Sequence, residues 1–260
     1  MNILEAIILG ILEGLTEFLP ISSTGHLILA SWIMGIQQTE AHKAFEVSIQ
    51  LGSILAVVFL YRDILFKNVE LWKRLIIAFI PTGTLGFLLY KLIKSLFSPI
   101  IVAVMLIVGG VIFLVVEKFY KEEKHQINSI DKISYKTAFF IGLFQSLAMI
   151  PGTSRSGATI IGGILLGLNR KTAAEFSFLL AVPTMFIATF YDIYKHYNEF
   201  QLDNWINLGT GFITAFIFGV ISIKILLNFI STYSFVAFGV YRIIVGLIFL
   251  YFVLYNNLMV

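Results

Sequence analysis

The stretch "TEFLPISSTGH", residues 16–26, decides how the chain folds. It follows an apolar run, yet it carries a carboxylate, a proline, three hydroxyls, a glycine and a histidine. Pro20 removes a backbone donor and disfavours helix at Leu19, so a first helix ends there. The hydroxyl residues that follow are good N-caps for a second helix: Ser22, Ser23 and Thr24. The stretch therefore predicts two half-length helices joined at a polar tip.

The surrounding composition is that of an integral membrane protein. Hydrophobic residues make up 58% of the 260 positions and charged residues only 13%, whereas soluble domains carry about 25% charged residues. A membrane-spanning helix needs about 20 apolar residues. Six segments meet that length: 45–61, 75–92, 99–117, 174–193, 206–228 and 235–255. Two more, 2–36 and 137–168, are interrupted by Pro and Gly and read as re-entrant helical hairpins, which are tolerated only where buried in protein or facing a wet cavity.

Other function classes are excluded by simple counts. The net charge of +3 gives no indication of nucleic-acid binding, and the absence of Cys removes disulfides and thiolate chemistry. The N-terminus has no Lys or Arg before its apolar run, so it is not expected to be a signal peptide.

The chain also repeats itself. A shift of 132 places Ser22 on Ser154 and Gly25 on Gly157. We expect a single membrane domain, 1–260, in which repeat one covers about 1–117 and repeat two about 137–257. A cytoplasmic loop at about 118–136 joins them. Each repeat holds one hairpin and three spans, so the second repeat enters the membrane from the opposite side, as in inverted-topology folds.

The distribution of basic residues predicts the orientation. Eleven cations fall on one side: Arg62, Lys67, Lys73, Arg74, Lys118, Lys121, Lys124, Lys132, Lys136, Arg170 and Lys171. Only Lys43, Lys91, Lys94 and Lys195 fall on the other. Because the basic side is cytoplasmic, both termini are expected outside, and the two hairpin tips are expected to meet near the midplane.

The second tip, "IPGTSRSGAT" at 150–159, repeats the design of the first. Pro151 and Gly152 break the helix, and hydroxyl residues surround Arg155: Ser154, Ser156 and Thr159. Helix N-termini attract anions, and a guanidinium binds phosphate bidentately. The two tips together predict a phosphate site. Gly25 has no side chain and so permits close approach of the phosphate to the backbone there.

Glu13 and Glu17 lie four residues apart and so share one helix face. A charge at membrane depth costs roughly 2.5–3.5 kcal/mol on insertion scales, so these carboxylates must face Arg155, a metal or a wet cavity. A purely structural Glu17–Arg155 pair is the alternative to a functional role. Carboxylates beside a phosphate site favour Mg²⁺ or Ca²⁺ and suit activation of a nucleophile. His26 is a candidate general acid or base.

Five stretches of the chain resemble the bacterial undecaprenyl-diphosphate phosphatase family of the bacitracin-resistance (BacA/UppP) type. Two are the tip motifs, "EGLTEFLPISSTGH" (13–26) and "PGTSRSGAT" (151–159). The other three are "FEVSIQLGSILAVV" (45–58), "AEFSFLLAVP" (174–183) and "YRIIVG" (241–246). The resemblance covers nearly the whole chain. It implies a cell-membrane hydrolase that converts undecaprenyl diphosphate to undecaprenyl phosphate and recycles the carrier for cell-wall synthesis. It also implies a divalent cation and a site open to the outer face.

Carried over by position, the resemblance makes Glu13 and Glu17 the acidic pair that also holds the metal. Its catalytic loop comprises Ser22, Ser23, Thr24 and His26, and its phosphate loop Ser154, Arg155, Ser156 and Thr159. The nucleophile stays open between Ser22, Ser23, His26 and an activated water.

Two other functions remain as alternatives: a secondary transporter or flippase for a phosphorylated polyprenyl lipid, and a non-catalytic lipid-binding or scaffold membrane protein. The oligomeric state, a homo-oligomer included, is left open. Outside the tips, Arg242 is expected to snorkel to the cytoplasmic face, Glu46 to cap a helix or else to line the cavity, and His42 to be an ordinary loop residue.

Overall fold

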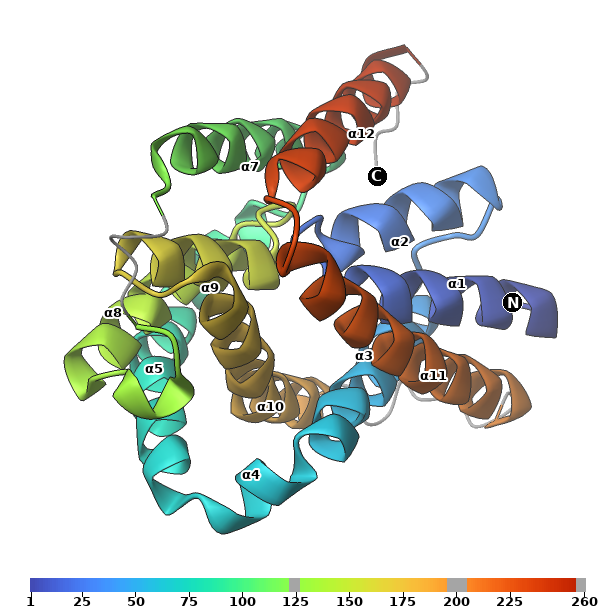
Figure 1. Cartoon of the computed structure of the whole chain (residues 1–260). Coiled ribbons are helices and arrows are strands. Elements are labelled where there is room, and N and C mark those ends of the chain that lie inside the picture. The colour runs from blue at the N-terminus through green and yellow to red at the C-terminus, as the bar shows by residue number, and fades with distance from the viewer. Residues whose placement is uncertain (122–126, 196–204, 256–260) are drawn as a thin grey trace.

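The computed structural model describes residues 1–121, 127–195 and 205–255, and this part of the chain is helical without any strand (Figure 1). An isolated bridge between Ile127 and Leu168 is its one β-type pairing. The helices are α1 (Ile3–Thr16), α2 (Ser23–Ile33), α3 (Glu40–Leu60), α4 (Arg62–Lys67), α5 (Val69–Leu88), α6 (Tyr90–Ser95), α7 (Pro99–Phe119), α8 (Tyr135–Ser146), α9 (Arg155–Leu165), α10 (Arg170–Lys195), α11 (Trp205–Ile230) and α12 (Val236–Tyr255). Short 3-10 turns lie at Ile130–Lys132 and Leu147–Met149.

Six of these helices are long and apolar enough to cross a membrane, which confirms the all-α, six-span prediction. They are α3, α5, α7, α10, α11 and α12. Large apolar side chains on their outer faces are exposed, for example Phe87 and Ile244, as expected where lipid replaces water as the neighbour. The expected connecting loop at 118–136 is shorter than predicted at its start, because α7 continues to Phe119. Residues 122–126 of that loop lie outside the described residues.

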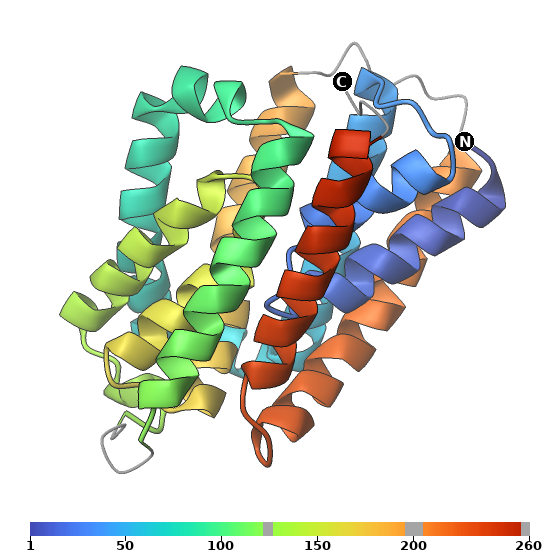
Figure 2. The same ribbon diagram turned by 90° about the horizontal axis from the view of Figure 1, so that it is seen from above.

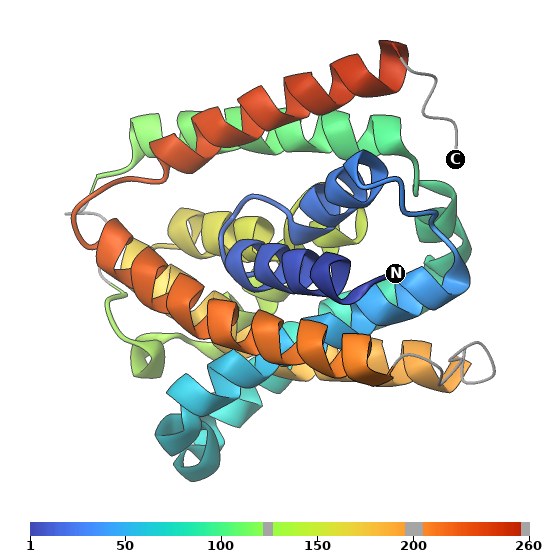
Figure 3. The same cartoon turned by 90° about the vertical axis from the view of Figure 1, so that its right-hand side faces the viewer.

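Each of the two interrupted segments is a pair of half-length helices, as the breakers predicted. The first pair is α1 and α2, joined by 17–22, and the second is α8 and α9, joined through the 3-10 turn at Leu147–Met149 and the residues up to Ser154. In Figure 2 the open ends of the two pairs lie at opposite ends of the bundle, and their tips approach each other in its middle. The long helices α7 and α12 run side by side past both tips (Figures 2 and 3).

The two halves of the chain interlock through these helix pairs. α1 packs on α11 of the second half, and α8 packs on α5 of the first half; α1 and α11 lie alongside each other in Figure 3. Glycines permit both approaches. A Cβ on Gly10 would lie 2.5 Å from the carbonyl oxygen of Gly211, and a Cβ on Gly142 would collide with the carbonyl of Ala78. Small residues at such crossings let helix backbones approach closely in a membrane.

Candidate active site

The two tips share an unusual backbone conformation. Ser22 and Ser154 have φ angles of 71° and 74°, and no other non-glycine residue in the described part of the chain has a positive φ. Each serine is the N-cap of the helix that follows, accepting the amide of Gly25 at 3.4 Å or of Gly157 at 3.1 Å. Positive φ at a residue with a Cβ costs free energy and persists only where the surroundings enforce it. Both serines are buried, and their hydroxyls are used to shape the tips.

An ion pair connects the tips. Arg155 Nη2 lies 2.8 Å from Oε1 of Glu17, and Arg155 Nη1 donates to the carbonyl of Ser177 at 2.9 Å. The other oxygen of Glu17, Oε2, accepts the hydroxyl of Ser23 at 2.6 Å. Ser23, Glu17 and Arg155 therefore form one continuous chain of hydrogen bonds across the two tips, in which a hydroxyl already points its proton at a carboxylate.

The other hydroxyls of the second tip hold the structure together. Ser156 donates to the carbonyl of Leu19 at 2.9 Å and so joins the two tips a second time. Thr159 is bonded to the carbonyls of Arg155 and Ser156 and to the hydroxyl of Ser177 at 2.6 Å. On the first tip, Thr24 is half-buried and Gly25 packs near Val102 of α7.

Buried polar atoms without a partner gather at the same place. Across the described residues, five of the nine buried side-chain atoms that lack a hydrogen-bond partner belong to four side chains: both oxygens of Glu13, Ser53 Oγ, Thr153 Oγ1 and Arg155 Nε. Buried polar groups are normally paired. Both oxygens of the fully buried Glu13 carboxylate lack a partner, although Ser53 is a neighbour of that carboxylate. Glu13 could therefore hold a cation, and the unpaired donors of Thr153 and Arg155 could bind phosphate oxygens.

Glu13 and Glu17 are the acidic residues that could hold a divalent cation. Glu13 has 0% exposure, and Glu17, Glu46 and Arg155 are the charged groups close enough to act on it. Within the described ranges, no three His, Asp or Glu side chains gather into a complete metal cage. Mg²⁺ is commonly bound by one or two carboxylates together with substrate phosphates and waters. Glu13 and Glu17 therefore match a magnesium-type site better than a closed protein cage.

His26 is held at both ring nitrogens. Nδ1 lies 2.8 Å from the carbonyl oxygen of Ser22, and Nε2 lies 2.8 Å from the hydroxyl of Tyr241, whose ring stacks on the imidazole. A carbonyl only accepts, so Nδ1 carries a proton, and in the neutral ring Nε2 accepts from Tyr241. Tyr241 was not singled out from the sequence as a site residue; a tyrosine in an apolar helix gives little signal by itself.

Three expectations about residues outside the motifs are wrong. Arg242 does not snorkel: its side chain is fully buried and binds backbone carbonyls at the tips. His42 is buried within α3, where Nε2 contacts Ser31 and Glu46. Glu46 does not cap α3, because Thr39 does so by accepting the amide of His42. The rule that ionisable groups at membrane depth face the protein interior would have placed Arg242 correctly.

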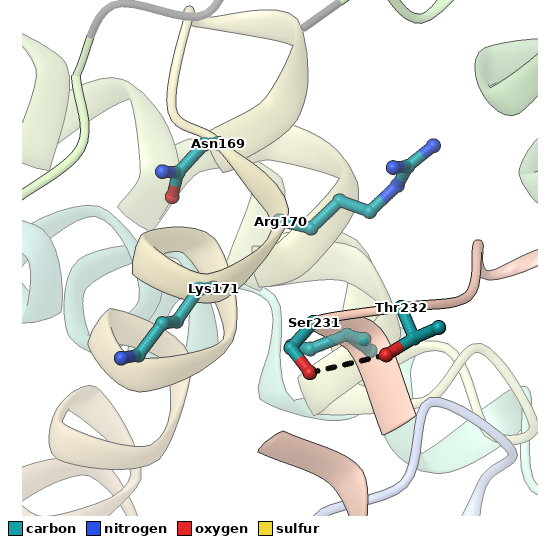
Figure 4. A pocket seen from close by; sticks show the side chains of 6 residues that line it. Asn169, Arg170, Lys171, Ser231 and Thr232 are labelled. Carbon is teal, nitrogen blue, oxygen red and sulfur yellow. Dashed lines mark hydrogen bonds between the residues drawn. The ribbon is translucent and has the colours of Figure 1, made fainter. Parts of the chain in front are cut away.

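A separate small pocket of ≈ 200 Å³ lies where α10 begins and α11 ends. Asn169, Lys171, Ser231 and Thr232 line it together with Arg170 (Figure 4). The guanidinium of Arg170 is bound to Glu117 at 2.6 Å, and no acidic residue or unpaired buried atom lines the pocket.

The sequence model of the family described as "Bacitracin resistance protein BacA" matches residues 6–248. The chain belongs to this family. A protein of Persephonella marina named undecaprenyl-diphosphatase is 71% identical over 98% of this chain and 100% of its own length. Proteins of the same name from Sulfurihydrogenibium sp. and Methanococcus aeolicus are 66% and 52% identical over 96% and 97% of this chain, and 98% and 99% of their own lengths. The resemblance drawn from the two motifs is thereby confirmed, and the family member described here is a multi-pass membrane protein.

Proposed function

We propose that the protein is an undecaprenyl-diphosphatase, which hydrolyses undecaprenyl diphosphate to undecaprenyl phosphate and inorganic phosphate. The relatives carry that name over their whole length. The observation that supports it in the structure is the chain from Ser23 through Glu17 to Arg155, a hydroxyl, a base and a phosphate-binding cation in contact. By removing one phosphate, the enzyme returns the lipid carrier to cell-wall synthesis.

In the first step, Ser23 attacks the terminal phosphorus of the diphosphate. Its Oγ proton passes to Oε2 of Glu17, 2.6 Å away. The bond between that phosphorus and the bridging oxygen breaks, and the lipid monophosphate leaves with the electron pair. Arg155 binds the transferred phosphoryl group through Nε, which has no protein partner, and the Arg155–Glu17 pair keeps the base oriented.

In the second step, water attacks the phosphoserine. Glu17, after its proton has passed to the departing lipid phosphate or to solvent, accepts a proton from that water. The bond between phosphorus and Oγ breaks, Oγ keeps the electron pair and takes the proton from Glu17, and Ser23 is regenerated as phosphate departs. Glu13 and Glu17 would hold a divalent cation, Mg²⁺ or Ca²⁺, and such a cation would supply positive charge beside the diphosphate oxygens. His26 fixes the carbonyl of Ser22 and so maintains the strained tip.

The orientation of the site belongs to the same proposal. Both termini and the open end of the first hairpin lie outside the cell, the hairpins are re-entrant, and the site opens toward the outer face of the cell membrane. Support comes from the basic residues of α4, the start of α5, the end of α7 and the start of α10, which the positive-inside rule places in the cytoplasm.

The test is phosphate release from undecaprenyl diphosphate by the purified protein in detergent, with Mg²⁺ and no ion gradient. We expect turnover by the wild type and a loss of about 10²–10⁴-fold in Glu17→Gln, the usual contribution of a general base. Glu70→Gln is the matched control, because Glu70 is exposed and pairs with Lys73 far from the tips. Lipid movement across vesicles without phosphate release would instead support the transporter alternative.

A further inference from the structure

Arg242 uses every donor that a guanidinium has. Its five N–H groups point at five backbone carbonyl oxygens, with N···O distances from 2.9 to 3.2 Å. The acceptors are Leu106 for Nε, Pro20 and Thr153 for Nη1, and Met105 and Gly152 for Nη2. The side chain has 0% exposure. Only arginine carries five N–H donors on one planar group, so lysine could not make all five of these hydrogen bonds.

The five carbonyls come from three separate elements. Pro20 belongs to the first tip, Gly152 and Thr153 belong to the second tip, and Met105 and Leu106 belong to α7. Carbonyls at a helix break lack the amide that would otherwise bond them, and a buried one must find another donor. One side chain of α12 therefore supplies donors to both broken tips at once and ties them to a long helix.

The charge itself has no acidic partner. Across residues 1–121, 127–195 and 205–255, no carboxylate forms an ion pair with Arg242. Only carbonyl dipoles compensate the guanidinium. A buried charge without a counter-ion is costly unless it is fully hydrogen-bonded, and here the five carbonyls supply those hydrogen bonds. An apolar residue would avoid the buried charge but would leave the carbonyls of Pro20, Gly152 and Thr153 without these donors, so the arginine is tied to the geometry of both tips.

The packing makes room for the guanidinium. A Cβ on Gly109 of α7 would collide with Nη2 of Arg242. On the other side, a Cβ on Gly157 would lie 3.1 Å from Nη1. Both glycines leave space for the planar group, so its position between α7 and the second tip is defined by the backbone around it.

We propose that Arg242 is the positioning residue of the active site, which fixes the separation of the two tips. Its hydrogen bonds end at Pro20, two residues before Ser22, and at Thr153, one residue before Ser154. These are the two serines whose positive φ must be enforced by the surroundings. By holding both tips against α7, Arg242 keeps Ser23 and Glu17 of the first tip in register with Arg155 of the second. The catalytic part of this inference rests on the proposed function; the geometric part does not.

The first test is Arg242→Lys, compared with Arg74→Lys. Arg74 is the matched control, because it also binds backbone carbonyls, those of Ile133 at 2.7 Å and Asp131 at 3.1 Å, at a place away from the tips. We expect Arg242→Lys to lower kcat by about 10²-fold, the usual effect of misplacing reacting groups by about 1 Å, while KM stays close to the wild-type value. Arg74→Lys should leave kcat unchanged. Equal losses of kcat in both variants would overturn the proposal.

The second test uses coupling between Arg242 and Gly109. Gly109→Ala in the wild type should displace the guanidinium and lower kcat roughly tenfold, a coupling within the usual range for residues in contact. In the Arg242→Lys background, the same change should have a smaller further effect, since Nη2, the guanidinium atom nearest to that Cβ, is gone and the lysine side chain is more flexible. Gly110→Ala is the control, because its Cβ would meet the carbonyl of Gly239 at 2.6 Å and should act alike in both backgrounds. Independent effects of Gly109→Ala and Arg242→Lys would overturn the proposal.

The third test measures geometry without turnover. The chain has no Cys, so spin labels can be placed at Ile33, at the end of α2, and at Leu165, at the end of α9, both of which are exposed. Electron–electron distance measurements should give a narrow distribution in the wild type and in Arg74→Lys, and a broader one in Arg242→Lys. An unchanged distribution in Arg242→Lys would refute the positioning role. Failure of every protein to release phosphate, with the broadening present, would refute only the proposed function.

Discussion

Arg155 Nη2 lies 2.8 Å from Oε1 of Glu17, although the two residues are 138 positions apart in the chain. The pair joins a tip made by the first half of the protein to a tip made by the second. The sequence left open the alternative that Glu17 and Arg155 only hold the tips together. The pair does join the tips; in addition, Glu17 accepts the Ser23 hydroxyl, and Nε of Arg155 has no protein partner.

Replacement of Arg155 by lysine keeps the charge and loses the planar fork. We expect Arg155→Lys to lower kcat/KM by about 10²–10³-fold, comparable to the removal of one preorganised donor. Arg170→Lys is the control, because Arg170 also pairs with a buried glutamate, Glu117, but at the far end of α7. Phosphate release by both purified variants measures the difference, and near-normal turnover by Arg155→Lys would exclude Arg155 from phosphate binding.

Ser23→Ala tests the nucleophile. The variant should lose at least about 10³-fold in rate, because the substitution removes the attacking group, and it should form no phosphoenzyme when ³²P-labelled substrate is quenched in acid. Ser222→Ala is a suitable control, since Ser222 is a buried serine that donates to the carbonyl of Leu15 at 2.8 Å. Persistent turnover by Ser23→Ala would exclude Ser23 as the nucleophile and leave Ser22, His26 and an activated water.

Glu13→Gln tests the cation site. The change keeps the shape of a fully buried side chain and removes the charge that would attract Mg²⁺. We expect the Mg²⁺ concentration at half-maximal rate to rise by about tenfold or more, the usual cost of one lost metal-site contact. His26→Ala should lower the rate without shifting that midpoint. A shifted midpoint in His26→Ala, with none in Glu13→Gln, would reverse the roles assigned to these residues.

Cysteine labelling tests the orientation. Two exposed lysines are suitable positions: Lys94 of α6 and Lys132 of the connection between the two halves. The predicted topology puts them on opposite sides of the membrane. An impermeant thiol reagent on intact cells should label Lys94→Cys and spare Lys132→Cys, because the basic loops stay in the cytoplasm. Labelling of Lys132→Cys alone would invert the proposed orientation.

Glu117→Ala should be the most destabilising of the changes considered outside the tips. Glu117 accepts two hydrogen bonds from Arg170, at 3.0 and 2.6 Å, and one from the amide of Phe235 at 3.0 Å. Loss of one partner of a buried ion pair costs about 3–5 kcal/mol. Thermal unfolding in detergent should show a clear fall in Tm, whereas Lys73→Ala, which breaks an exposed pair, should change it little.

The positions of the helix breaks, and the polar residues that stand at them, could be predicted from local sequence. Pro20 with Ser22, and Pro151 with Ser154, act through backbone geometry within a few residues, so their effect needs no knowledge of the fold. The six spans follow from length and hydropathy in the same way. His26 was less predictable: its partner Tyr241 lies 215 positions away, and nothing in either residue alone specifies the contact.

The sequence by itself determined that the protein is helical, that it spans a membrane, and that a carboxylate, serines and an arginine stand at two helix breaks. Only the tertiary structure decided how these groups meet. It pairs α1 with α11 and α8 with α5, directs Ser23 to Glu17, leaves Glu13 without a partner, and places Arg242 between the tips instead of at the membrane surface. The physical reason is the range of the forces. Helix formation and helix breaking are local, whereas a buried donor must find its acceptors wherever the packed chain brings them.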